Sequence, residues 1–194
     1  MPGAPVITSR FPCRPWPAVR AAAPWLLGLL CLALARPAAA QATSPEVLKA
    51  EVVYRVLMFV NWPADREQPG RSLQLCTVGE GRMDGALQVL AGRSIRQLTV
   101  DVRHGVRAEQ LAGCHLLYLP TPQPALRAAL AELPVLVVSD AATMLDQGAM
   151  LNLQVEDGRI VFDVELDAAR RVGLVVSTKL LRLARFVRHQ VSAP

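Results

Sequence analysis

Two continuous apolar runs constrain the fold of this chain most. Residues Cys114–Leu119 form the first run, which Pro120 closes, and residues Val135–Ser139 form the second, which ends at Asp140. Runs without polar alternation are typical of central strands that are covered on both faces. The segment between them, 124–133, is helical in composition. This order predicts a three-layer α/β domain, with a mostly parallel sheet and helices on both faces.

The segments before these runs continue the alternation. A first helix is predicted over Thr43–Asn61, because Ser44 suits the N-cap and Pro45 suits the first helical position. Trp62-Pro63 stops this helix, since a residue before proline disfavours helical geometry. Further expected elements are strands at Leu73–Val78 and Arg96–Val102 and short helices at Met83–Leu90 and Ala141–Gln147.

The C-terminal third carries a hairpin signal. Apolar residues alternate along Leu151–Val155 and again along Ile160–Val164, with Asp157-Gly158 between the two runs. An Asp-Gly pair in this position is a strong hairpin signal, so we expect an antiparallel edge on the sheet. Beyond it, Asp167 is expected to cap a short helix that ends at Gly173.

A last helix is predicted to start at Ser177 or Thr178 and to run to about His189. Its cations would form one stripe opposite an apolar face, and they are Lys179, Arg182, Arg185 and Arg188. This stripe is either a solvated face whose charges suit a helix C-terminus, or a contact surface for an acidic partner or an anionic ligand. Trp62 is similarly either a core anchor or a partner-binding residue.

The first forty residues predict export. Arg20 precedes the apolar stretch Ala21–Ala35, and Ala38-Ala39-Ala40 offers small residues for cleavage before Gln41. We therefore expect a signal peptide at residues 1–40 and one mature periplasmic domain at residues 41–194. A transmembrane anchor is the other interpretation, but the stretch is shorter than the roughly 20 apolar residues that a spanning helix needs.

The distribution of charge argues against nucleic acid as a partner. The chain carries a net charge of +5, from 21 basic and 16 acidic residues. Four of the basic residues are arginines in the first forty positions, which hold no acidic residue, so 17 basic and 16 acidic residues remain beyond them. A near-neutral domain lacks the dense excess of Lys and Arg that nucleic-acid binding needs.

Two cysteines, Cys76 and Cys114, lie in the expected mature part. In an oxidising compartment such a pair favours one disulfide, which the chain-entropy model values at roughly 3–4 kcal/mol. The residues alone leave a second interpretation open, in which both cysteines are buried free thiols.

One segment comes close to a dinucleotide-binding fingerprint. Residues Val78–Gly85 follow a strand, open a helix and contain three glycines. The third glycine comes one residue late for G-x-G-x-x-G, and charged side chains crowd the place where a pyrophosphate would approach. We therefore interpret the segment as a glycine-bearing turn.

No other pattern in the sequence points to catalysis. The histidines at His104, His115 and His189 show no metal-ligand spacing. The sequence also lacks a nucleophile elbow, a phosphate-binding loop and a paired-carboxylate pattern. We therefore expect neither a cofactor, a metal site nor an enzymatic activity.

Several segments resemble one known family in their order and spacing. They are Phe59–Pro63, Leu75–Gly79, Leu90–Arg93, Gly113–Leu117, Pro134–Asp140, Gly148–Asn152, Asp157–Arg159, Ala168–Arg171 and Leu180–Ala184. On these residues the chain resembles the YfiR family of periplasmic regulators. The resemblance implies a repressor that binds the periplasmic domain of an inner-membrane diguanylate cyclase and so lowers cyclic di-GMP signalling and biofilm formation.

The same resemblance carries further implications. It implies a homodimer, an outer-membrane protein that sequesters the repressor, and a structural disulfide between Cys76 and Cys114. The chain lacks the second cysteine pair of some family members, and Glu165 stands where a more neutral strand-end residue is expected. An alternative to this regulatory function remains open. The chain could be a small-ligand-binding protein or an enzyme that uses the crevice at the strand ends.

Overall fold

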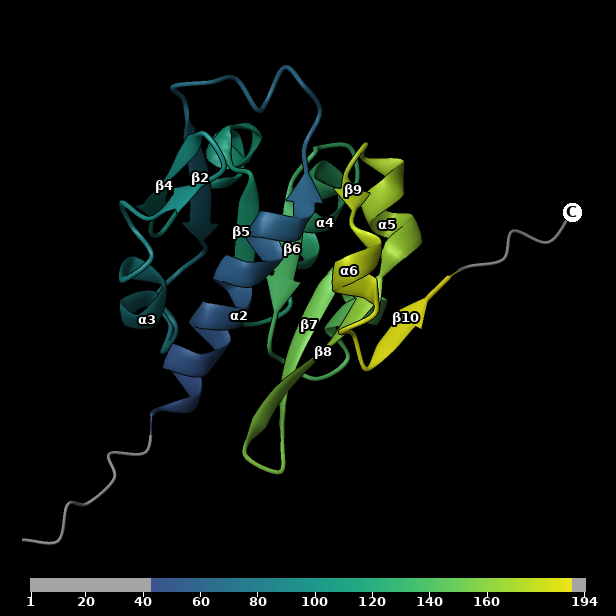
Figure 1. Cartoon of the computed structure of the whole chain (residues 1–194). Coiled ribbons are helices and arrows are strands. Elements are labelled where there is room, and N and C mark those ends of the chain that lie inside the picture. The colour runs from purple at the N-terminus through teal and green to yellow at the C-terminus, as the bar shows by residue number, and fades with distance from the viewer. Residues whose placement is uncertain (1–42, 190–194) are drawn as a thin grey trace, which may run out of the picture. The chain divides into compact units, whose positions relative to one another are not determined.

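Figure 1 shows the chain as a computed structural model, which describes residues 43–189. The signal peptide expected at residues 1–40 and the mature start at Gln41 lie outside the described residues. In chain order the elements are α2 (Pro45–Phe59), β1 (Val60–Asn61), β2 (Ser72–Thr77), α3 (Asp84–Gln88), β3 (Ser94–Ile95), β4 (Leu98–Arg103), the 3-10 helix η1 (Ala108–Gly113), β5 (Leu116–Leu119), α4 (Pro124–Leu130), β6 (Leu136–Ser139), the 3-10 helix η2 (Met144–Gln147), β7 (Leu151–Glu156), β8 (Arg159–Glu165), α5 (Leu166–Arg171), β9 (Val175–Val176), α6 (Thr178–Leu181) and β10 (Phe186–Arg188).

The main sheet has eight strands in the order β10-β8-β7-β6-β5-β2-β4-β3. The neighbouring strands are parallel except in the β7–β8 and β3–β4 pairs, which are antiparallel. Strands β5 and β6 lie inside the sheet, which confirms the prediction from the two apolar runs. The mostly parallel α/β fold is therefore the one that the sequence predicts.

Helices cover both faces of this sheet. Along β5, Leu116 and Tyr118 belong to one apolar core with residues of α2, whereas Leu117 and Leu119 belong to a second core with η1, α4 and η2. Successive strand residues point to opposite faces, so a continuous apolar run supplies both cores. Figure 1 shows α2 on one side of β5 and β6 and α4 on the other. Burying one such leucine stabilises the fold by roughly 1.5–3 kcal/mol.

The first helix starts where its sequence predicts. The Ser44 side chain accepts a hydrogen bond from the Val47 N–H at 3.4 Å, and Pro45 occupies the first helical position. Such a cap contributes about 1 kcal/mol. The helix ends at Phe59 rather than Asn61, because Val60–Asn61 pair with β9 in a separate two-stranded sheet.

The C-terminal hairpin forms as predicted, with β7 and β8 in an antiparallel register. Asp157 and Gly158 at its tip have φ angles of 49° and 73°, the left-handed geometry that favours Asp-Gly in a two-residue turn. The hairpin is not the edge of the sheet, because β10 pairs with the outer side of β8.

Three smaller expectations also need correction. The helix predicted at Ala141–Gln147 is reduced to η2, which Gly148 closes at a φ of 106°. Strand β3, which the sequence did not predict, folds back on β4 through a turn at Arg96 with a φ of 53°. Asp167 lies in the first turn of α5, and the N-cap position belongs to Glu165.

Candidate functional site

The C-terminal segment differs most from the sequence prediction. Helix α6 has Ser177 as its N-cap but stops at Leu181 instead of running to His189. The chain then turns, and β10 pairs in parallel with β8. The prediction of one helical stripe that carries four cations is therefore wrong. The cations instead separate into two that are bound internally and two that face solvent.

Arg185 is the first internally bound cation. Its Nε donates to Oδ1 of Asp163 at 2.9 Å, its Nη2 donates to the other oxygen of that carboxylate, and its Nη1 donates to Glu156. The hydrogen bond to Asp163 is the main reason that the pKa of Arg185 is raised. Asp163 is buried in β8. A buried carboxylate without a counter-charge is costly, which favours the turn toward β8 over a longer helix.

Arg188 is the second internally bound cation. Its Nη1 donates to Asp146 at 2.7 Å, and its Nε lies 3.6 Å from Oε2 of Glu165. The hydrogen bond to Asp146 is the main cause of a raised pKa for Arg188. Glu165, the last residue of β8, is buried. The acidic residue that looked out of place in the sequence thus faces a counter-charge from β10.

The other two cations remain exposed. The side chains of Lys179 and Arg182 form no ion pair or hydrogen bond with any residue between 43 and 189. Leu183 and Phe186 follow them with exposed fractions of 67% and 55%. We call Lys179, Arg182, Leu183 and Phe186 the α6 patch. Exposed apolar side chains that follow such cations closely in the chain suit a partner surface that combines apolar and acidic groups.

Trp62 is a core anchor in this structure. Its side chain is 5% exposed, and its Nε1–H donates to the backbone oxygen of His115 at 2.9 Å. The indole ring of Trp62 and the imidazole ring of His115 pack edge to face, with their centroids 5.7 Å apart. The Trp62 N–H also donates to Glu67 at 3.0 Å. The side chain that sequence reasoning considered for partner binding is therefore used inside the domain.

Arg96 supports the same region and was not found by sequence reasoning. Its Nη1 donates to the backbone oxygens of Met58 and Val60 at 3.3 Å, at the C-terminus of α2. Its Nη2 binds Glu67 at 2.5 Å, and Glu67 in turn holds the Trp62 backbone. A cation placed at a helix C-terminus satisfies free carbonyls there. Nothing in the local sequence connects Arg96 to a helix that ends 37 positions earlier.

The Cys76–Cys114 disulfide is present, with the two Cα atoms 5.9 Å apart. It joins β2 to the residue just after η1, and both cysteines are at most 1% exposed. This finding confirms the disulfide interpretation and excludes the pair of free thiols. Because the sulfur atoms are buried, the bridge is part of the second apolar core.

His115 follows Cys114 of this bridge and lies just before β5. Its Nδ1 accepts from the Gln74 N–H at 3.0 Å, and its Nε2 lies 3.1 Å from the Arg66 backbone oxygen. These partners fix a neutral ring with the proton on Nε2. Burial is the main cause that lowers the pKa of His115. The histidine therefore connects the loop after β1 to two strands, and it has no base-like role toward Cys114.

The carboxyl ends of β5 and β6 carry a further polar cluster. Lys49 from α2 forms a 2.6 Å ion pair with Asp140, and the Tyr118 hydroxyl donates to the other oxygen of that carboxylate. Burial and the hydrogen bond to Asp140 raise the pKa of Tyr118. Open α/β sheets usually hold ligands at this edge. Here the three groups satisfy one another and connect α2 to the strand ends.

The turn at Val78–Gly85, which resembled a dinucleotide-binding fingerprint, uses one of its backbone N–H groups in an internal hydrogen bond. Gly79 has a φ of 71°, and the Gly81 N–H donates to Oδ2 of Asp84 at 2.9 Å. A bound phosphate would need such an N–H for itself. The contact supports the interpretation as a glycine-bearing turn.

Residues 43–189 contain neither a metal-binding cluster nor a membrane-spanning helix. No cluster of three or more His, Cys, Asp or Glu side chains in this range could hold a metal ion. None of the helices described here is long and apolar enough to cross a membrane.

The fold, the disulfide and the α6 patch define an α/β domain with exposed surface groups that suit binding. A model of the YfiR/HmsC-like family matches residues 46–185, and the chain belongs to this family. This finding confirms the resemblance stated from the sequence.

A solved structure described as an ABC domain in complex with L-Trp, from Streptococcus pneumoniae, is also similar. It is 9% identical, the match covers 74% of this chain and 62% of that one, and the TM-score is 0.45. At this level of similarity the match supports no argument about function.

Proposed function

We propose that the domain is a non-catalytic periplasmic regulator that binds the periplasmic domain of an inner-membrane diguanylate cyclase. By binding, it represses the cyclase and lowers cyclic di-GMP. Membership in the YfiR/HmsC-like family supports this role. The disulfide supports the compartment, because such bonds persist in oxidising environments.

The α6 patch is the observation that carries the proposal. The side chains of Lys179 and Arg182 form no ion pair or hydrogen bond between residues 43 and 189. An acidic protein can therefore form ion pairs with them without breaking a contact within the fold. Leu183 and Phe186 add apolar area that binding would remove from water. Apolar groups at the centre of a contact and complementary charges around it are the usual anatomy of a protein interface.

A genetic experiment tests the regulatory role. Deleting the gene in a strain that expresses the membrane cyclase proposed as its partner should raise cyclic di-GMP and biofilm. Deleting the cyclase as well should abolish the rise. Unchanged cyclic di-GMP in the single deletion, with the cyclase present, would contradict repression.

Surface variants test the binding site itself. Lys179→Glu/Arg182→Glu should weaken retention of the cyclase on the tagged regulator and raise cyclic di-GMP. Arg71→Glu/Arg159→Glu is the matched control, because both arginines are exposed and their side chains have no partner within 43–189. Normal repression by a folded α6-patch variant would show that the patch is not part of the interface. The regulatory role itself would then be tested by the deletion experiment alone.

The proposal also includes export, dimerisation and release. Intact mass of periplasmic protein should place the mature start near Gln41. Light scattering should give the mass of a homodimer. An outer-membrane protein that sequesters the regulator should restore cyclase activity when it is overproduced.

A further inference from the structure

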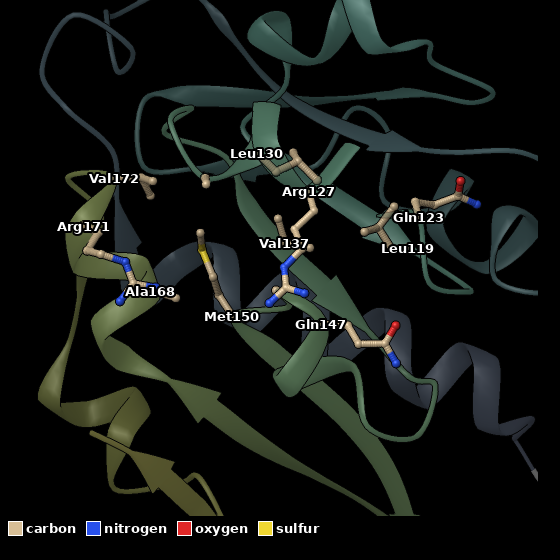
Figure 2. A pocket seen from close by; sticks show the side chains of 12 residues that line it. Leu119, Gln123, Arg127, Leu130, Val137, Gln147, Met150, Ala168, Arg171 and Val172 are labelled. Atoms are coloured by element: carbon tan, nitrogen blue, oxygen red, sulfur yellow. The ribbon is translucent and has the colours of Figure 1, made fainter. Parts of the chain in front are cut away.

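A second candidate binding site lies between α4, η2 and α5, and Figure 2 shows its lining side chains. The cavity has a volume of about 130 Å³. Its floor is apolar and comes from β5, β6, α4 and the residue just before β7. The buried side chains of the floor are Leu119, Leu130, Val137 and Met150.

Two arginines give this pocket a positive rim. The Arg171 side chain makes no ion pair or hydrogen bond within the described part of the chain. Arg127 makes one long contact, a 3.3 Å hydrogen bond to the backbone oxygen of Asp146. In Figure 2, Arg127 lies among the central lining side chains, and Arg171 lies to one side beside Ala168. Within residues 43–189, neither guanidinium is neutralised by a carboxylate.

Two acidic groups in an adjoining hollow reduce this positive charge without cancelling it. Asp146 and Glu165 line an adjoining hollow together with Arg127 and Arg171. Both carboxylates face Arg188, at 2.7 Å and 3.6 Å respectively. The two carboxylates and the three arginines Arg127, Arg171 and Arg188 therefore lie around the opening of the pocket. Their charges sum to one net positive charge.

The volume limits what the pocket can hold. A cavity of roughly 150 Å³ accommodates a benzene ring, whereas sites for nucleotides and drug-sized ligands measure about 300–1,000 Å³. The apolar floor favours a compact hydrocarbon group, and the arginines favour a carboxylate at its end. We propose that this pocket binds a small monocarboxylate with a compact apolar body of about five to eight carbons. This binding does not depend on the cyclase or on the α6 patch.

Titration of the isolated, isotope-labelled mature protein with sodium hexanoate tests the proposal. Saturable NMR shifts are expected at the signals of Leu130, Val137 and Met150, with a dissociation constant of about 1 mM or lower. Hexan-1-ol and hexylamine carry the same chain without the carboxylate, so they should bind at least about fivefold more weakly. Added salt should weaken the binding of hexanoate.

Two variants locate the site. Arg171→Gln should weaken hexanoate binding about fivefold, as expected for an exposed ion pair, while Arg159→Gln at the distant hairpin tip should leave it unchanged. Ala131→Leu should block the pocket from its exposed rim without altering the core, since Ala131 lines the pocket and is exposed. The absence of saturable shifts, equal binding of hexan-1-ol, or normal binding by folded Arg171→Gln or Ala131→Leu would each overturn the proposal.

Discussion

Removing the disulfide tests how the two apolar cores are held together. The perturbation is Cys76→Ala/Cys114→Ala, which removes a cross-link over a sequence separation of 38 residues. For a loop of this length the chain-entropy model gives about 4 kcal/mol at 25 °C. Domains of this size are stable by about 5–15 kcal/mol. The variant should therefore lose a quarter or more of its stability, and its Tm should fall by about 8–16 °C.

Urea denaturation followed by circular dichroism measures this loss. Because a cross-link mainly restricts the unfolded chain, the variant should show a larger m-value as well as a lower free energy of unfolding. Wild-type protein that is unfolded, reduced and refolded with reductant is the matched control, since it keeps both sulfur atoms without the bond. Reductant added to the native protein should act slowly, because both cysteines are at most 1% exposed.

Two results would refute this reasoning. Equal stability of oxidised and reduced wild type would show that the cross-link contributes nothing. A loss in the alanine variant without a loss in the reduced wild type would assign the effect to packing of the buried sulfur atoms instead of the cross-link.

Three further predictions concern side chains whose contacts the structure defines. Burial lowers the pKa of His115, so between that pKa and about 6.5 the unfolded chain binds a proton that the folded chain does not. The free energy of unfolding should therefore fall as the pH drops from about 7 to 5, and urea curves with His115→Gln should show a weaker pH dependence. Arg185→Gln should lower the urea midpoint whereas Arg182→Gln should not, because Arg185 neutralises the buried Asp163; equal midpoints would contradict this pairing. Trp62→Phe should reduce the free energy of unfolding by about 1 kcal/mol in the same assay, because it removes one buried hydrogen bond; an unchanged value would show that the bond adds no net stability.

The interior strands and the hairpin could be predicted because their signals are local. An apolar run such as Cys114–Leu119 is buried on both faces most readily as a central strand of a sheet. Asp157-Gly158 favours its turn through its own backbone preferences, whatever lies around it. The disulfide was open between two interpretations on the residues alone, because spacing along the chain does not state distance in space.

The last helix was predicted wrongly because its competing interactions are non-local. Residues Lys179–Arg185 have a helical period, and a period is what sequence reasoning detects. The deciding partner is Asp163, which lies on β8 and is buried, and its charge draws Arg185 toward β8. Arg96 was missed for the same reason, since its carbonyl partners lie more than 30 positions away. Ion pairs and caps that join distant segments need the fold to be known first.

The division of the four cations also limits where a protein partner can bind. If an acidic partner used Arg185, that arginine would have to leave Asp163 or share its charge, and the buried carboxylate would lose its partner. Binding there would cost stability, so substitutions at Arg185 should change folding and repression together. The side chains of Lys179 and Arg182 form no ion pair between residues 43 and 189 that a partner would have to break. Substitutions at these two positions should therefore change repression while the urea midpoint stays the same, which is the behaviour expected of a contact surface built on a finished fold.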